Sequence, residues 1–505
     1  MSAGKDSFNG WTRRDMAFGI ARAGAAAAIA LPQIARATVI DPDITIEAAD
    51  GAYFSIEGWP HFPGIRYARA ERFGPPVAIF AAEQTSGRIF GPACPQRGGR
   101  YLPQSEDCLF LNVWMPPKRS RKPRPVMVYF HGGAYSAGSV TDPLNNGAKL
   151  AAQGEVVVVT VNHRLNALGY LYLPDRFPGS GNNGQLDLIC ALEWVKRNID
   201  AFGGDPGNVT LFGQSGGGAK IATLMAMPEA AGLFHKAITM SGQQVTASGP
   251  LNASRRTSAY LDALGRDTDP ATVAVEALME ALGAIDPVLG GGVYMGPVLD
   301  MRHLHRHPFW PDAPPQSADI PMLLGNTVME TRAFYAPDGQ QLAGLSFDNL
   351  ARRIAPEMRV DIEPAWVVGQ FRERYRQATA LELFHRIVTA ARSWRGQVEE
   401  AEARARSGKG NTFVYQLDFE QAKHTDDIGL AFGTLPDPTP EQAAMSETVM
   451  AAFVRFARTG KPGWPAYDLE TRATMIFDRE SQVTNDPRAW ERQLFARVPY
   501  IQPGS

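Results

Sequence analysis

Three short apolar runs in the middle of the chain dominate its pattern of hydrophobic and polar positions. They cover residues 126–130, 156–161 and 209–212, and nearly every successive position in them is apolar. Apolar side chains on both faces are expected of parallel strands that helices cover on each side. The runs therefore predict buried strands of a parallel sheet.

Helical patterns separate these runs and continue after them. Residues 184–202 carry apolar side chains at near-helical spacing, and residues 215–227 are rich in small residues. Further candidate strands are 237–240, 321–324, 413–417 and 474–477, and further helices are expected within 253–284, 346–404 and 440–459. Such alternation favours one doubly wound α/β domain, with a mostly parallel central sheet, helices on both faces and long helical insertions.

The N-terminus has the pattern of an export signal. Residues 12–18, Thr-Arg-Arg-Asp-Met-Ala-Phe, resemble a twin-arginine motif, and an alanine-rich stretch then ends in the small-x-small pattern of residues 35–37. We predict a signal peptide over residues 1–37, a mature domain over 38–505 and a periplasmic or secreted location. An amphipathic helix of a cytosolic protein is the alternative. The lack of an uninterrupted apolar run of about 18 residues argues against stable membrane insertion of the mature chain.

Composition excludes several classes of function. Hydrophobic residues make up 44% of the 505 positions and charged residues 20%, which is ordinary for a globular protein with a large core. The net charge is −2 and no polybasic stretch occurs, so nucleic acid is a poor candidate partner. The chain contains neither a GxxxxGK[ST] phosphate loop nor an HExxH metal helix.

The chain has only three cysteines, which excludes a disulfide-rich scaffold. Cys94 and Cys108 enclose a polar, glycine-containing segment and suit one loop-closing disulfide in an oxidising compartment. Cys190 lies in a helical pattern between apolar neighbours and is expected to be a small buried hydrophobic residue.

The strongest local motif is Gly-Gln-Ser-Gly-Gly at residues 213–217, directly after a predicted strand and before a predicted helix. In that context Gly-x-Ser-x-Gly predicts a nucleophile elbow, a sharp turn that presents the serine hydroxyl above the sheet. Glycines are needed because side chains there would clash with neighbouring elements. Ser215 is therefore the candidate nucleophile, and its chemistry requires a base, an orienting acid and an oxyanion hole.

The segment that follows the predicted strand 126–130 is a candidate for the oxyanion hole. It reads His-Gly-Gly-Ala-Tyr over residues 131–135. The backbone N–H groups of Gly133 and Ala134, with that of Gly216 after the nucleophile, would bind the developing negative oxygen. A plain glycine turn is the alternative.

With these motifs in place, the sequence resembles the type-B carboxylesterase/lipase (cholinesterase-like) family of α/β-hydrolases, and in particular its exported bacterial members. The matching segments are 62–67, 91–96, 105–114, 162–164, 181–187, 201–206, 209–218, 456–462 and 464–467. The resemblance implies an α/β-hydrolase fold and hydrolysis of a small-molecule carboxylic ester by a Ser-His-Glu triad. It implies no metal and no organic cofactor.

The family resemblance also nominates the acid and the base. Residues 321–330 resemble the segment that carries the acid, which points to Glu330, with Asp300 as its rival. His424 lies in a segment similar to the catalytic-histidine loop of the family. The order Ser215, Glu330, His424 is the one expected of an α/β-hydrolase.

The other histidines and a nearby serine receive supporting or local roles. His131 adjoins the oxyanion segment, and His163 is expected to support a neighbouring turn. The alternating histidines 303, 305 and 307 suggest a metal site only weakly, because no carboxylate or cysteine pattern accompanies them. By resemblance, Cys94–Cys108 is the N-terminal disulfide of the family, and Ser241 is the serine behind its triad.

One departure from the family concerns substrate charge. Gln214 precedes the nucleophile where the family often has glutamate, which puts a preference for cationic esters in doubt. Amide or carbamate hydrolysis by the same triad stays open, as does a non-catalytic binding protein on the same scaffold. Four aromatic residues are candidates for the pocket entrance, with burial in the core as the alternative: Tyr135, Trp310, Phe334 and Tyr335.

Overall fold

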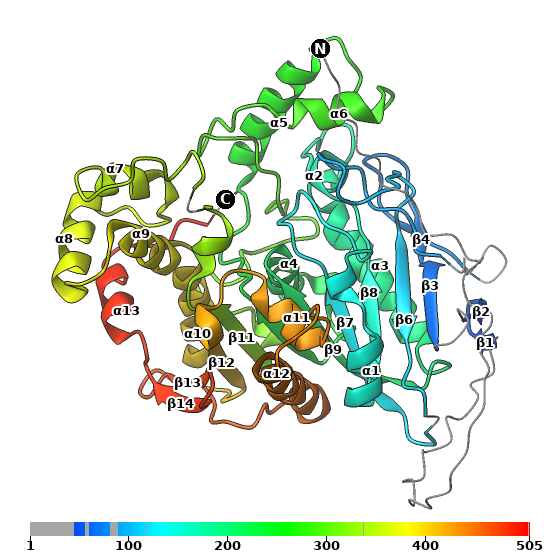
Figure 1. Cartoon of the computed structure of the whole chain (residues 1–505). Helices are drawn as coiled ribbons and strands as arrows, with labels where there is room; N and C mark the ends of the chain where they lie inside the picture. The colour runs from blue at the N-terminus through cyan, green and yellow to red at the C-terminus, as the bar shows by residue number, and fades with distance from the viewer. Residues whose placement is uncertain are drawn as a thin grey trace, which may run out of the picture. The chain divides into compact units, whose positions relative to one another are not determined.

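A ten-stranded sheet runs through the described part of the chain, as Figure 1 shows. Its strand order is β14-β13-β12-β11-β10-β9-β7-β8-β6-β3. The strands are β3 His61–Arg66, β6 Phe110–Trp114, β7 Arg124–Phe130, β8 Val157–Val161, β9 Gly204–Gln214, β10 Lys236–Met240, β11 Met322–Thr327, β12 Thr412–Leu417, β13 Ala473–Phe477 and β14 Gln482–Asn485. Every pairing from β8 to β13 in this order is parallel, while β3, β6 and β14 pair antiparallel at the two edges. The predicted mostly parallel sheet is confirmed.

The structure is a computed structural model, and it describes residues 45–55, 60–80, 89–118, 120–336, 338–502 and 504. The predicted signal peptide and its cleavage site lie outside these residues. Residues 40–505 form one compact unit, to which all described residues belong. No helix in the described part of the chain is long and apolar enough to cross a lipid bilayer.

Thirteen helices are assigned among the described residues. They are α1 Ala148–Gly154, α2 Asn166–Tyr170, α3 Asn183–Asn198, α4 Gly216–Leu224, α5 Pro250–Leu264, α6 Val275–Ala281, α7 Leu350–Ile354, α8 Pro364–Arg374, α9 Ala380–Thr389, α10 Arg395–Arg406, α11 Asp426–Phe432, α12 Pro440–Thr459 and α13 Ala489–Phe495. A π-helical turn, Ala390–Trp394, joins α9 to α10. The helices expected within 253–284 and 346–404 are thus several short helices, and α12 spans the segment predicted at 440–459.

Both faces of the central strands are buried, as their apolar runs predict. On β7, Val126, Val128 and Phe130 belong to a core that includes side chains of α3 and α4. Met127 and Tyr129, which alternate with them, belong to a second core with side chains of α1, α11 and α12. Successive side chains of a strand point to opposite faces, so helices cover the sheet on both sides.

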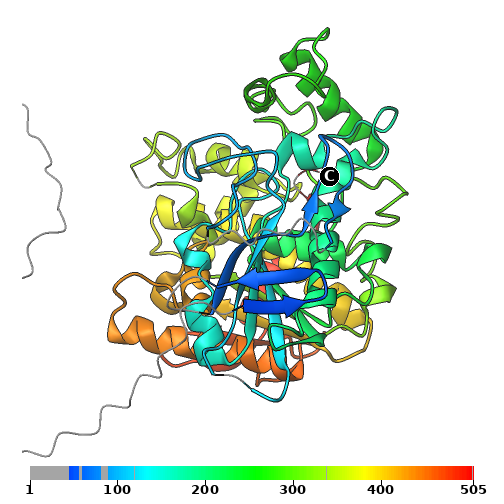
Figure 2. The same cartoon turned by 90° about the vertical axis from the view of Figure 1, so that its right-hand side faces the viewer.

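Shorter elements complete the described chain. Two small sheets consist of β1 Thr45–Ala48 with β2 Gly51–Phe54, and β4 Ala68–Arg69 with β5 Val77–Ala78. The β1–β2 pair lies beyond the β3 edge of the central sheet (Figures 1 and 2). Helices α7, α8, α9 and α13 share a third core of their own, away from the strands.

The predicted disulfide is not seen in the structure. Cys94, Cys108 and Cys190 are all free and buried. The thiols of Cys94 and Cys108 nevertheless lie within hydrogen-bonding distance, and this hydrogen bond and burial raise the pKa of Cys108 well above its usual value. Packing therefore places the two sulfur atoms side by side. Cys190 is buried in α3, as its apolar neighbours predict.

Candidate active site

Ser215 lies at the sharp turn between β9 and α4. Its φ of 54° is in the left-handed region, and its N–H donates to Met240 O on the neighbouring strand at 2.7 Å. A β-carbon at Gly217 would come within 1.9 Å of Phe130 O, so only glycine fits there. The turn has the geometry expected of a nucleophile elbow, with the serine at the C-terminal end of a central strand.

His424 and Glu330 are held together behind this turn. Each follows a strand of the sheet: Glu330 lies after β11, and His424 lies between β12 and α11. His424 Nδ1 donates to Glu330 Oε2, while Glu330 Oε1 accepts from Ser241 Oγ at 2.5 Å and from Thr327 N–H at 2.7 Å. The carboxylate is completely buried and both of its oxygens are used.

The charge on Glu330 is set by these contacts. Burial alone would raise its pKa, but the His424 charge and the hydrogen bonds from His424, Ser241 and Thr327 outweigh burial and lower the pKa. Asp427, a second buried carboxyl group, has a pKa raised to about 7 by burial and by the charge of Glu330. Glu330 is therefore the carboxylate that carries the negative charge at neutral pH beside the imidazole.

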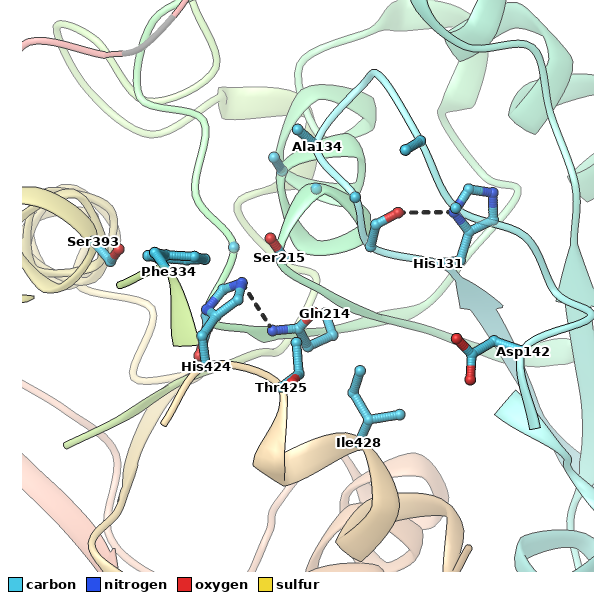
Figure 3. A pocket seen from close by; sticks show the side chains of 18 of the residues that line it. His131, Ala134, Asp142, Gln214, Ser215, Phe334, Ser393, His424, Thr425 and Ile428 are labelled. Carbon is cyan, nitrogen blue, oxygen red and sulfur yellow. Dashed lines mark hydrogen bonds between the residues drawn. The ribbon is translucent and has the colours of Figure 1, made fainter. Parts of the chain in front are cut away.

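Figure 3 shows how Ser215, His424 and Gln214 lie relative to one another, with the serine hydroxyl on the side of the imidazole. The Nε2 atom of His424 lies 3.2 Å from Nε2 of Gln214. Because Nδ1 carries the proton that is donated to Glu330, Nε2 is unprotonated, and its lone pair accepts a hydrogen bond from the Gln214 amide. Within the described residues Ser215 Oγ makes no hydrogen bond to His424. Such a bond is often long in a ligand-free site and shortens when substrate binds.

The oxyanion segment, residues 132–134, packs directly against the elbow. Gly133 and Ala134 have φ values of 89° and 54°, and the N–H group of neither donates to another residue in the described chain. A β-carbon at Gly216 would lie 2.2 Å from Ala134 O, so the two backbones are in contact. Gly216 is also the first residue of α4, where a helical N–H has no partner within the helix. The backbone at Ala134 therefore lies against the residue that directly follows Ser215.

A cavity of about 660 Å³ opens over these groups. Ser215, His424 and the oxyanion segment line it, together with charged side chains that include Arg97, Asp142 and Arg392. Its volume is within the usual range for small-molecule sites.

Only one of the four aromatic candidates for the entrance lines this cavity. Phe334 does so, with its ring 4.8 Å from that of His424. Tyr135 is buried in the core, Tyr335 lines a separate cavity, and Trp310 is more than half exposed and lines neither. Packing between segments that are distant in the sequence decides which of these rings line the cavity, so the sequence pattern alone could not predict it.

Comparison with known proteins agrees with this geometry. The sequence profile of the carboxylesterase family matches residues 52–495. The para-nitrobenzyl esterase of Bacillus subtilis is 36% identical over 443 residues, which are 80% of this chain and 87% of that protein. The chain belongs to the carboxylesterase family. It is a carboxylic ester hydrolase with the α/β-hydrolase fold.

Two further relatives of this carboxylesterase extend the comparison. The medium-chain fatty acyl-CoA hydrolase precursor of Anas platyrhynchos is 31% identical, over 79% of this chain and 77% of that protein. The solved carboxylesterase of Geobacillus stearothermophilus superposes with a TM-score of 0.78 at 33% identity, over 89% of this chain and 99% of that one. The predicted family and fold are confirmed.

The rival candidate for the triad acid and the candidate metal ligands of the carboxylesterase have local roles. Asp300 Oδ1 accepts hydrogen bonds from three nearby backbone N–H groups and so closes a turn. The three neighbouring histidines face separate partners: Glu229 for His303, the Arg302 carbonyl for His305 and the Ala247 N–H for His307. The described residues contain no group of three or more histidine, cysteine or acidic side chains that could hold a metal ion.

The rings of His131 and His163 stack 4.7 Å apart beside the oxyanion segment of the carboxylesterase. Burial and the charge of Lys220 lower the pKa of His131 to about 3 and that of His163 well below its usual value. Both rings are therefore neutral. Lys220 is a buried residue of α4 that the sequence motifs did not nominate, although a cation among small and apolar residues was a visible signal.

Proposed function

We propose that this carboxylesterase hydrolyses small-molecule esters by two-step acyl transfer, with Ser215 as nucleophile, His424 as base and Glu330 as orienting acid. The observation that carries the proposal is the pairing of His424 Nδ1 with the buried Glu330 carboxylate. This pairing fixes the tautomer whose Nε2 has a lone pair on the side of Ser215. No organic cofactor or metal enters the proposed steps.

In the first step, Ser215 Oγ attacks the ester carbonyl carbon while His424 Nε2 takes the hydroxyl proton. The C=O π electrons move to the carbonyl oxygen, which the N–H groups of Gly133, Ala134 and Gly216 bind. When the tetrahedral intermediate collapses, the bond to the alcohol breaks, and the imidazolium gives its proton to the leaving oxygen. The product of this step is an acyl-enzyme.

In the second step, water takes the place of the serine hydroxyl. His424 Nε2 removes a proton from water as the water oxygen attacks the acyl carbon, and the same three N–H groups bind the oxyanion. Collapse breaks the bond to Ser215 Oγ, which regains its proton from His424. Throughout both steps, the negative charge of Glu330 stabilises the imidazolium, because the two groups share a buried hydrogen bond.

The test uses a p-nitrophenyl butyrate assay on the wild type and on Ser215→Ala. We expect the variant to keep its folded structure and to lose at least about 10⁴-fold in kcat/KM, because the hydroxyl that forms the acyl-enzyme is removed. Ser446→Ala is a matched control, since Ser446 is buried in α12 and its hydroxyl donates only to Leu430 O. Wild-type activity in Ser215→Ala would overturn the proposal.

A further inference from the structure

Lys220 is a completely buried lysine on the helix that begins directly after the nucleophile. Its Nζ donates to Ala134 O at 2.7 Å and to His131 O at 3.3 Å. It also lies 5.5 Å from the centre of the Tyr135 ring. Within the described chain no carboxylate forms an ion pair with it. A buried ammonium whose hydrogen-bond acceptors are backbone carbonyls needs an explanation, because an uncompensated buried charge is costly.

The two carbonyls that Lys220 holds flank the oxyanion segment symmetrically. The peptide units 132–133 and 133–134 supply the N–H groups of Gly133 and Ala134. The carbonyl of His131 belongs to the peptide unit just before these two, and the carbonyl of Ala134 belongs to the one just after. Lys220 therefore ties down both ends of the segment, and rotation of either donor peptide is restricted as a result.

The titratable groups that face Lys220 are all neutral and do not compensate its positive charge. From the segment after β7 these are His131 and Tyr135, and from the segment after β8 it is His163. Both histidines are neutral, and burial raises the pKa of Tyr135 well above its usual value, so that the phenol is neutral too. From α3 the neighbour is the amide of Gln185, which donates to the Lys220 carbonyl at 3.1 Å. The cation thus acts on its surroundings from a buried position, with no counter-charge against it among the described residues, where electrostatic effects are strong.

We propose that Lys220 is a positioning residue of the oxyanion hole, which clamps both ends of the segment 132–134 and places a positive charge behind the developing negative oxygen. This inference rests on the proposed acyl-transfer function. Preorganised charge that meets an oxyanion in a buried site stabilises the transition state more than the substrate. The effect of Lys220 should therefore fall on kcat rather than on KM.

The first test replaces Lys220 by methionine, which has similar length but neither charge nor donor. We expect kcat for p-nitrophenyl butyrate to fall about 10- to 100-fold while KM changes less than about threefold. The affinity for a trifluoromethyl ketone, whose tetrahedral adduct carries an oxyanion, should fall by a similar factor. A purely structural lysine would lower the melting temperature and leave both quantities unchanged in the folded protein.

Lys236→Met is the matched control. Lys236 is also largely buried, and its Nζ donates to Asn208 Oδ1. It is the first residue of β10, and the opposite end of that strand is the one that adjoins Ser241. We expect this variant to lose stability and to keep its kcat. Equal losses of kcat in Lys220→Met and Lys236→Met would overturn the inference, as would an unchanged kcat in Lys220→Met. Either result leaves the acyl-transfer proposal intact, because that proposal depends on Ser215→Ala.

The second test is the pH profile of kcat/KM. The wild-type profile alone tests the inference, so the test remains available if Lys220→Met does not fold. Burial lowers the pKa of Lys220 to about 7, so its ammonium is charged below that pH and neutral above it. We expect kcat/KM, which reports the free enzyme, to fall as pH rises through this region. In Lys220→Met the fall on the basic side should disappear. A wild-type profile that stays level up to pH 9 would contradict the inference.

Discussion

Replacing Glu330 by glutamine tests the orienting role of the buried carboxylate. Both oxygens of Glu330 accept hydrogen bonds: Oε2 from His424 Nδ1, and Oε1 from Thr327 N–H and the Ser241 hydroxyl. An amide has only one oxygen, and its NH₂ group cannot accept. The Thr327 N–H is a fixed donor, whereas the Ser241 hydroxyl can rotate, so the amide oxygen must stay on the Thr327 side.

The amide NH₂ of Glu330→Gln then faces His424 Nδ1 and forces that nitrogen to become an acceptor. The imidazole proton moves to Nε2, which is the atom that must take the proton of Ser215. The same change of tautomer in a serine-histidine-carboxylate triad lowers kcat by about 10⁴-fold, or about 5 kcal/mol of barrier. We therefore expect a loss of this size in Glu330→Gln, with the fold retained because the side-chain volume is nearly unchanged.

The assay is kcat/KM with p-nitrophenyl butyrate from pH 5 to 9, together with a circular dichroism melt. Ser241→Ala is the matched control, because it removes one hydrogen bond to Glu330 but leaves the carboxylate and the histidine tautomer unchanged. Its loss should stay below about 200-fold, since a hydrogen bond to a charged group is worth about 1.5–3 kcal/mol and each 1.4 kcal/mol of barrier is about tenfold in rate. Activity of Glu330→Gln within tenfold of the wild type would refute the reasoning.

Two further predictions follow from single contacts, and a third follows from the N-terminal sequence. Gln214→Glu places a negative charge where an amide lies 3.2 Å from the imidazole. We therefore expect kcat/KM for a cationic ester to rise about tenfold relative to its neutral isostere. Gly217→Ala should lower the free energy of unfolding by more than about 3 kcal/mol in urea titrations, whereas Gly369→Ala, on the open face of α8, should raise it by about 0.5–1 kcal/mol. The export hypothesis predicts that Edman sequencing of protein from the producing cells begins after Ala37, and retention of Met1 would count against it.

The central sheet was predictable because its strands are short and apolar on both faces. The runs at 126–130 and 156–161 correspond to β7 and β8 within two residues. The breaks inside the helical insertions were harder to predict, since they depend on local turns. Gly265, with a φ of 102°, ends α5 in the middle of a segment whose composition is otherwise helical.

The candidate site was predictable where chemistry imposes a local motif. The elbow glycines around Ser215 and the glycines at 132–133 are such cases, because the backbone must approach other backbone closely there. Lys220 and Arg392 had no comparable motif, since their positions depend on packing between distant segments. The Cys94–Cys108 disulfide stays a prediction: the structure brings the two thiols together, as the spacing predicts, but shows no bond between them.

Covalent labelling tests the central claim, that Ser215 is the nucleophile, most directly. Diethyl p-nitrophenyl phosphate should inactivate the enzyme with release of one equivalent of p-nitrophenol, because a triad serine attacks phosphorus as it attacks a carbonyl. Peptide mass spectrometry should then place one diethylphosphoryl group on Ser215, and Ser215→Ala should take up none. An inactivated enzyme with its adduct on another residue, or an enzyme that hydrolyses esters and is never labelled, would contradict the claim.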